Sequence, residues 1–252
     1  MSDFINKTYL VTGATSGIGR ATALALLKAG AFVGVNHYND HDGFDDLVRE
    51  LKDQCPEAGN RIIELPGDVS KRQAVEQMVA VLVEHTQRLD GLINNAGISQ
   101  IKPFIEITDE DWDQLINTDL KSVFLCCQAA IPHLQKTGGT IVNVASELAL
   151  TGRARFAHYT AAKGGVISLT RSLAREFAPE IRVNGIAPGP TKTPMLDAEA
   201  QVPGHQEPVD DIPMKRVATA EEIADSILFL ASEKAGYFCG EIISPNGGSV
   251  MR

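Results

Sequence analysis

The sequence predicts one α/β domain, in which a doubly wound, Rossmann-type parallel sheet of seven strands carries helices on both faces. Short β-rich runs alternate with segments of 3.6-residue apolar periodicity along the whole chain. Because parallel neighbours need a right-handed crossover, this alternation favours a parallel sheet with helices on both sides. The 252 residues contain no Pro/Ser-rich linker, so a single domain over 1–252 is expected.

Each strand is expected where β-branched and apolar residues cluster over four to six positions. The seven runs lie at 9–12, 31–36, 61–66, 91–94, 140–145, 182–186 and 241–244. Helical periodicity is found over 20–30, 71–88, 112–134 and 159–177 and from 219 onward. Ligands of such a sheet bind at the carboxyl ends of its strands, so the residues that follow each run are the candidates for a site.

Composition excludes several classes of protein. The formal net charge is −9 and Lys and Arg are not clustered, which argues against nucleic acid as a partner. No run reaches the ~20 apolar residues of a membrane span, and 1–7 has no basic leader, so we expect a cytoplasmic protein with no membrane contact. The four cysteines show no metal-ligand spacing, so we expect reduced thiols and no metal site.

The end of the first strand is rich in glycine. The residues after it are Gly13-Ala14-Thr15-Ser16-Gly17-Ile18-Gly19, and an alanine-rich helix follows. Glycines permit a tight turn and close backbone approach, while a helix N-terminus offers free N–H groups to a pyrophosphate. Strand, turn and helix in this order predict a dinucleotide site built by Gly13, Ser16, Gly17, Ile18 and Gly19; a turn without a ligand is the alternative.

The ends of the second and third strands should lie near the adenosine. Enzymes selective for NAD usually carry an acidic residue at the second strand end, which would repel the extra phosphate of NADP. Here Asn36 and His37 stand in that place, so we expect NADP(H) to be preferred over NAD(H), with His37 as the nearest donor. A solvent-exposed turn residue is the alternative role of His37. Asp68 and Val69 follow the third strand and are expected to position adenine; a helix cap is the alternative role of Asp68.

The fourth strand ends in four small or amide residues, Asn94-Asn95-Ala96-Gly97. Small residues let a nucleotide lie close to the backbone, and asparagines supply donors and acceptors to a ribose. The same residues would otherwise form a plain turn. We therefore expect all four to contribute to cofactor binding.

Proton-transfer chemistry is predicted for Ser146, Tyr159 and Lys163. Tyr159 and Lys163 are four apart, so they share one helix face, and a nearby ammonium lowers the pKa of a phenol from its usual value of about 10. Such a pair can act as a general acid and base. Ser146 follows the buried run at 140–145, where its hydroxyl could hold a substrate oxygen. By spacing alone, an ordinary surface pair on an amphipathic helix is the alternative.

These motifs, taken in order, resemble the short-chain dehydrogenases/reductases over essentially the whole chain. The matching residues are Thr12-Gly13-x3-Gly17-Ile18-Gly19, Asn94-Asn95-Ala96-Gly97, Ser146, Tyr159-x3-Lys163, Pro188-Gly189 and Asn246-Gly247-Gly248. The resemblance implies that Tyr159 is the general acid/base, that Ser146 orients the substrate oxygen, and that Lys163 lowers the tyrosine pKa and holds the nicotinamide ribose. Asn117 matches the fourth family residue, which helps to hold a water beside the lysine.

The resemblance also implies contacts to the nicotinamide after the sixth strand and an oxidoreductase activity. Pro188, Gly189, Thr191 and Thr193 would bind the cofactor, with Thr191 holding the carboxamide through its backbone and Thr193 through its hydroxyl. Hydride would move between the nicotinamide and a carbon bearing oxygen. The proline-rich segment 191–217 would form a substrate loop that closes as a lid.

The substrate is left open between two enzyme classes. Overall similarity is closest to the 3-oxoacyl-(acyl-carrier-protein) reductases, in which a basic surface that includes Arg153 and Arg155 would meet an acidic carrier. Polar residues expected at the pocket favour a sugar or polyol dehydrogenase instead; the expected pocket residues are Gln100, Glu147, Leu148, Arg153 and His158. A nucleotide-sensing regulatory protein is the third hypothesis, and it would be marked by a broken catalytic set.

Assembly is expected from two helical segments. The segments 112–134 and 159–177 carry apolar residues on more than one face, which suits burial against a partner subunit. The resemblance implies pairing of these helices into a homodimer or homotetramer. A homotetramer is expected.

Overall fold

All seven predicted strands form one parallel sheet, in the order β3-β2-β1-β4-β5-β6-β7. The computed structural model describes residues 2–205 and 209–251. The strands are β1 (Thr8–Val11), β2 (Phe32–His37), β3 (Ile62–Pro66), β4 (Gly91–Asn94), β5 (Thr140–Val144), β6 (Arg182–Ile186) and β7 (Ile242–Ile243). Strand order reverses between β1 and β4, and a crevice for ligands is expected outside the sheet at such a point.

Helices fill the crossovers between the strands. They are α1 (Gly17–Lys28), α2 (His41–Gln54), α3 (Arg72–Thr86), α4 (Asp109–Ile116), α5 (Ser122–Thr137), α6 (Leu148–Thr151), α7 (Ala157–Phe177), α8 (Pro194–Ala200) and α9 (Ala220–Ala231). Among the described residues, no helix is both long enough and apolar enough to cross a bilayer.

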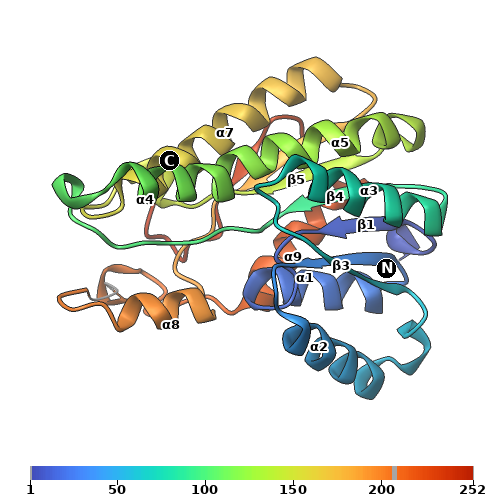
Figure 1. Ribbon diagram of the computed structural model, residues 1–252, viewed down its shortest axis with the longest axis horizontal. Helices are drawn as coiled ribbons and strands as arrows, with labels where there is room; N and C mark the ends of the chain where they lie inside the picture. Colours follow the sequence, from blue (N-terminus) through green and yellow to red (C-terminus); the bar gives the residue numbers. More distant parts are fainter. Residues whose placement is uncertain (1, 206–208, 252) are drawn as a thin grey trace.

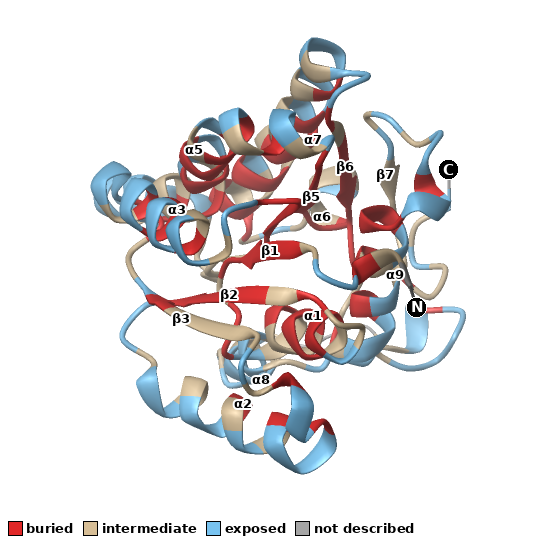
Figure 2. Ribbon diagram, turned by 90° about the vertical axis from the view of Figure 1, so that its right-hand side faces the viewer, coloured by how far each residue is buried: buried red, intermediate tan, exposed pale blue. Residues whose placement is uncertain are grey.

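The sheet lies between two layers of helices (Figures 1 and 2). Apolar residues of α1, α2 and α9 pack on one face, where Leu27, Leu47 and Ile227 are fully buried. Residues of α3, α5 and α7 pack on the other face, among them Leu82 and Val166. Strands buried on both faces explain why the sequence shows continuous apolar runs there instead of alternation. The rigid sheet positions the loops at its carboxyl edge.

The helix predicted over 112–134 is divided into three pieces. α4 begins at a capping box, in which Thr108 Oγ1 accepts a hydrogen bond from the Asp111 N–H and Asp111 Oδ2 accepts one from the Thr108 N–H. A π-helical turn over Asn117–Lys121 then separates α4 from α5. Such turns insert a residue into the helical repeat and often occur at functional sites. The inserted residue changes which side chains face the sheet.

The segment 191–217 is more regular than the predicted loop. It contains α8, whose first turn is capped by Thr193 Oγ1, which accepts the Leu196 N–H at 3.3 Å, and whose first residue is Pro194. A 3-10 helix over Val209–Asp211 follows. Residues 206–208 of the expected lid lie outside the described part of the chain. Figure 1 shows that α8 stands apart from both helix layers.

Candidate active site

A cavity of about 240 Å³ opens at the carboxyl ends of β1, β4, β5 and β6. Its walls come from the glycine-rich turn after β1, the turn after β4, the segments that follow β5 and β6, the first turns of α7, and α8. Segments that are far apart in the sequence, between residues 13 and 199, therefore meet at the carboxyl ends of the strands, where the site was predicted.

The cavity brings together Ser146, Tyr159 and Lys163, as the sequence analysis expected of them. Ser146 lies two residues after the end of β5, and its Oγ accepts the Leu148 N–H at 3.2 Å. Tyr159 and Lys163 lie one turn apart in α7, and the Lys163 Nζ is 5.8 Å from the centre of the Tyr159 ring. Lys163 Nζ also donates to the Val144 carbonyl at 3.2 Å. All three side chains are at least nine-tenths buried, so water screens their charges little.

The predicted effect of Lys163 on the pKa of Tyr159 is present, but burial outweighs it. The pKa of Tyr159 is raised above its usual value of 10.0, because burial disfavours the phenolate. The Lys163 ammonium and a hydrogen bond with Ser146 act in the expected direction and lower the pKa, but Asp119 and Glu199 raise it further. The spacing of tyrosine and lysine could not reveal this outcome, because desolvation and the two carboxylates arise only in the folded protein.

The structure also corrects the assignment of Asn117. The Asn117 Oδ1 accepts a hydrogen bond from the Lys121 ammonium at the surface, at 3.2 Å, and Asn117 does not line the cavity. Asp119 is fully buried instead, with its Oδ2 3.2 Å from Lys163 Nζ. The π-helical turn over Asn117–Lys121 explains the error, because it changes the face on which each residue emerges.

The glycine turn after β1 is built for close approach. Gly13 adopts φ +60°, and a Cβ there would lie 2.9 Å from the Ala96 Cα. A Cβ on Gly19 would collide with the Gly13 carbonyl oxygen and with Asn95 Nδ2. That amide donates to the carbonyls of Thr12 and Gly13, both at 3.0 Å, so it fixes the turn after β1 to the turn after β4. Ser16, Gly17 and Ile18 line the cavity, as do Asn95, Ala96 and Gly97.

Two predicted cofactor ligands point into the protein. Asn36 is 1 % exposed; its Oδ1 accepts the Gly13 N–H at 3.3 Å and its Nδ2 donates to the carbonyls of Leu65 and Gly67. Asn94 is 3 % exposed and donates to Asn143 Oδ1 at 2.8 Å. Their side chains brace the sheet and the glycine turn, which corrects the expectation of direct contact with a ribose. Burial of strand-end side chains could not be read from residue type.

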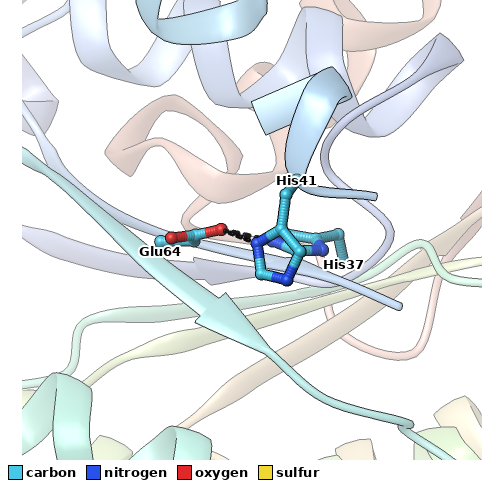
Figure 3. A group of neighbouring side chains, drawn as sticks. All are labelled: His37, His41 and Glu64. Atoms are coloured by element: carbon cyan, nitrogen blue, oxygen red, sulfur yellow. Dashed lines mark hydrogen bonds and ion pairs between the residues drawn. The ribbon is translucent and has the colours of Figure 1, made fainter. Parts of the chain in front are cut away.

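His37 is also turned away from a ligand. It is 2 % exposed, its Nδ1 accepts the Asp40 N–H at 3.1 Å, and its Nε2 lies 2.9 Å from Glu64 Oε1. His41 Nδ1 approaches the same oxygen at 2.7 Å, and Figure 3 shows both rings converging on Glu64. Because the Asp40 N–H occupies the lone pair of Nδ1, Nε2 of His37 carries the proton that Glu64 accepts. These three groups resemble a metal-ligand set, yet His37 has no free lone pair for an ion.

The remaining predicted cofactor residues lie on two other strand ends. Asp68 Oδ1 accepts the Ser70 N–H at 2.9 Å in a turn before α3, and Val69 is buried in the core; neither lines the cavity. Their roles toward adenine stay predictions. After β6, the cavity is lined by Pro188, Gly189, Thr191 and Thr193.

The expected substrate residues divide into two groups. Glu147, Leu148 and Arg153 line the cavity. Gln100 and His158 do not: His158 is fully buried and its Nε2 lies 2.8 Å from Gln100 Oε1, while the Gln100 amide donates to Asp111. Burial lowers the pKa of His158, which favours its neutral form. This pair therefore ties α7 to α4 and corrects the expectation that both residues face a ligand.

The cavity wall formed by α8 was not predicted from the sequence. Met195, Leu196 and Glu199 line the cavity opposite the glycine turn. Their segment was expected to be an irregular loop, so no face could be assigned to it. Thr193 and Pro194 were the available signals, since a threonine followed by proline is typical of a helix start.

Comparisons with known proteins agree with this geometry. Residues 13–249 match the family described as Enoyl-(Acyl carrier protein) reductase. The chain is 37% identical to the 3-oxoacyl-(acyl-carrier-protein) reductase FabG of Staphylococcus epidermidis, over 98% of this chain and 100% of that protein. It is 38% identical to the cis-4-hydroxycyclohexanecarboxylate dehydrogenase of Sinomonas cyclohexanicum, over 97% of each chain.

A solved structure of a related protein has the same fold. This chain superimposes with a TM-score of 0.90 on a crystal structure from Brucella melitensis. That protein is described as short-chain dehydrogenase/reductase SDR, glucose/ribitol dehydrogenase. The two chains are 39% identical, and the match covers 99% of each.

Proposed function

The chain belongs to the short-chain dehydrogenase/reductase family, whose members are NAD(P)-dependent oxidoreductases, and we propose that it reduces the ketone of a 3-oxoacyl thioester. The observation that carries the proposal is the cavity that holds Ser146, Tyr159 and Lys163 beside the glycine turn. A proton donor and a candidate dinucleotide cradle thus share one cavity.

The chain's own residues fit a dinucleotide. Gly17 has φ +50°, and a Cβ there would lie 2.9 Å from Thr193 Cγ2, so only glycine leaves the space between the turn and α8 open. α1 begins at Gly17, and its first N–H groups and dipole suit a pyrophosphate. Thr191 and Thr193 would hold the carboxamide, and Lys163 the ribose. A bound reduced nicotinamide supplies the hydride for the reaction.

Proton transfer is the task of Tyr159. In the reducing direction, its hydroxyl donates a proton to the oxygen of the substrate carbonyl, and the Ser146 hydroxyl donates a hydrogen bond to the same oxygen. In the oxidising direction, the phenolate accepts the proton of the substrate hydroxyl. The raised pKa of Tyr159 keeps it protonated at neutral pH, which suits the reducing direction.

For the cofactor we propose NADP(H) in preference to NAD(H). The support is that β2 ends in Asn36-His37 without a carboxylate of its own, and that the exposed imidazole of His41, which contacts Glu64, lies beside this end. Parallel fluorescence titrations with NADPH and NADH test the preference. Tighter binding of NADPH is expected, and equal or weaker binding of NADPH would contradict it.

A sugar or polyol dehydrogenase is the second candidate, because the cavity contains Glu147. This carboxylate is 7 % exposed and accepts a hydrogen bond from the Ser249 hydroxyl. Carboxylates suit the hydroxyls of a sugar. The basic surface expected for an acidic carrier gains little support, since Arg153 stacks over the Phe156 ring at 5.4 Å and Arg155 donates to the Pro203 carbonyl.

A panel of substrates separates the three hypotheses. Oxidation of NADPH is followed with 3-oxoacyl thioesters, sugar ketones and simple ketones, and reduction of NADP with sugars and polyols. Turnover of thioesters supports the reductase, and turnover of sugars or polyols alone supports the dehydrogenase. Tight nucleotide binding without turnover of any substrate would indicate the nucleotide-sensing protein.

Replacing Tyr159 tests the proposed chemistry directly. Tyr159→Phe removes the proton donor and leaves the ring, so turnover should fall by a factor on the order of 10² to 10⁴ while cofactor binding stays near normal. Tyr237→Phe is the matched control, because Tyr237 is a fully exposed tyrosine that does not line the cavity. Retained turnover in Tyr159→Phe would show that another group supplies the proton.

We further propose a single-domain homotetramer in the cytoplasm. The assembly is supported by Trp112 on α4 and Phe124 on α5, which are each about two-fifths exposed and so leave apolar surface for a partner subunit. The cytoplasm is supported by the four cysteines, which are all free thiols. Light scattering at micromolar concentration should give four times the chain mass, and a homodimer would give twice that mass. A stable monomer would contradict the proposal.

A further inference from the structure

A buried carboxylate adjoins the proposed catalytic group. Asp119 lies on the π-helical turn between α4 and α5 and is fully buried. Its Oδ1 accepts the Ile98 N–H at 2.8 Å, and its Oδ2 lies 3.2 Å from the Lys163 ammonium. Within the described part of the chain, that ammonium is the only partner of Oδ2. An uncompensated carboxylate is costly at such a place, so the ion pair with Lys163 accounts for its presence.

Asp119 and Lys163 depend on each other for their charges. Burial lowers the pKa of Lys163, but Asp119 and Tyr159 outweigh this effect and raise it. Burial is the largest effect on Asp119 and leaves its pKa above the usual 3.8, although Lys163 and the Ile98 N–H act in the opposite direction. Both contacts of Asp119 stabilise its ionised form, so the carboxylate and the ammonium stand together next to Tyr159.

The net field at Tyr159 differs from that of a lone lysine. The charged groups around the cavity are Lys163 on α7, Asp119 on the π-helical turn, Glu199 on α8, and Glu147 and Arg153 after β5. Lys163 lowers the pKa of Tyr159, whereas Asp119 and Glu199 raise it. A neutral amide in place of the Asp119 carboxylate would remove one of the two carboxylates that oppose the ammonium at Tyr159.

We propose that Asp119 is a positioning residue that holds the Lys163 ammonium and offsets its charge at Tyr159, so that Tyr159 is kept as a proton donor for carbonyl reduction. The proposal rests on the proposed function for its catalytic meaning, but the charge effect on Tyr159 exists without any substrate. Ionisation of Tyr159 needs the field of Lys163, and Asp119 weakens that field. The site is therefore biased toward reduction.

Asp119→Asn tests the charge with little change in shape. Ultraviolet titration of tyrosinate, taken as the difference from the same protein with Tyr159→Phe, isolates Tyr159 without substrate or cofactor. Tyr159 should ionise at lower pH in Asp119→Asn, with its ionised fraction at a fixed pH higher by a factor on the order of ten. The pH profile of kcat/KM for alcohol oxidation should shift to lower pH with it.

Asp90→Asn is the matched control. Asp90 is a buried aspartate directly before β4, at the amino ends of the strands and so on the side of the sheet away from the cavity. Its Oδ2 accepts the Thr8 N–H at 2.8 Å, and both of its oxygens accept hydrogen bonds from Arg88. This change should leave the titration of Tyr159 and the pH profile where they are in the wild type. A merely structural role for Asp119 would lower stability in the same way as the control and leave both profiles unshifted, which would overturn the proposal.

A second measurement on the unmodified protein keeps the proposal open to refutation if Asp119→Asn does not fold. The wild-type Tyr159 should ionise above the ordinary tyrosine value of 10.0. Ionisation well below that value would overturn the proposal. A shifted titration without turnover of any ketone supports the role of Asp119 and contradicts the proposed function, whereas turnover with an unshifted titration contradicts the role of Asp119 alone.

Discussion

At the scale of single residues, the proposed chemistry depends on which side chains are buried with Tyr159. The spacing of Tyr159 and Lys163 and the position of Ser146 after a strand could be predicted from the sequence, because helix and strand geometry fix them. The raised pKa of Tyr159 and the place of Asp119 could not, since both depend on packing between α7 and the π-helical turn.

Removing the Ser146 hydroxyl should separate orientation from proton transfer. Ser146→Ala deletes a donor to the substrate oxygen and a hydrogen bond with Tyr159, so kcat should fall by a factor on the order of 10² to 10³ with a smaller change in cofactor affinity. Steady-state kinetics and fluorescence titration measure the two effects. Ser226→Ala, at a half-buried serine of α9 that does not line the cavity, is the control. Unchanged kcat in Ser146→Ala would remove Ser146 from the catalytic group.

At the scale of elements, alternation and glycine content predicted the sheet and the turn after β1. The divided helix at 109–137 and the helix within 191–217 were not predicted. A π-helical turn leaves no local signal in composition, and α8 is only seven residues long, too short for a periodic pattern.

The glycine turn should be the most sensitive element to added volume. In Gly19→Ala the new Cβ meets the Gly13 backbone and Asn95, so the turn must move and its N–H groups lose their alignment. Cofactor Kd should rise roughly tenfold or more, because a hydrogen bond to a charged group contributes about 1.5–3 kcal/mol. Gly59→Ala is the control, since its Cβ would meet its nearest atom at 3.5 Å. Normal cofactor affinity in Gly19→Ala would contradict the assignment of the cradle.

The first turn of α9 should make stability depend on pH. Hydrogen bonds from Arg216 and from the Thr219 N–H lower the pKa of Glu222 from 4.5 to about 2. Because the folded pKa is depressed, the ionised carboxylate stabilises the protein above pH 4.5, and this contribution is lost as the pH falls toward 2.

Glu222→Gln keeps the shape of the capping box and removes the charge. The free energy of unfolding, measured by urea denaturation across this range, should be lower in the variant at neutral pH and should approach that of the wild type at acid pH. Glu221→Gln, in the same turn, is the control. A difference that does not change with pH would contradict the role of the Glu222 charge.

At the scale of the whole molecule, the site exists because parallel strands bring distant loops to one edge. The order of strands and helices predicted the fold class and placed the site at the carboxyl ends of the strands. It also predicted that Gly13, Asn95, Ser146 and Thr191 would lie close together. The inward orientation of Asn36, His37 and Asn94 did not follow, because whether a strand-end side chain faces a ligand or the core depends on neighbours in space.

Isotope transfer is the most direct measurement of the central proposal, that hydride and proton are exchanged at one cavity. The protein is incubated with reduced nicotinamide cofactor deuterated at C4 and with the ketone that it turns over, and the alcohol is analysed by mass spectrometry. We predict one deuterium on the carbon that bears the new hydroxyl, with the rate of its formation lower in Tyr159→Phe by a factor on the order of 10² to 10⁴. An alcohol without deuterium, or equal labelled product from Tyr159→Phe, would contradict the proposal.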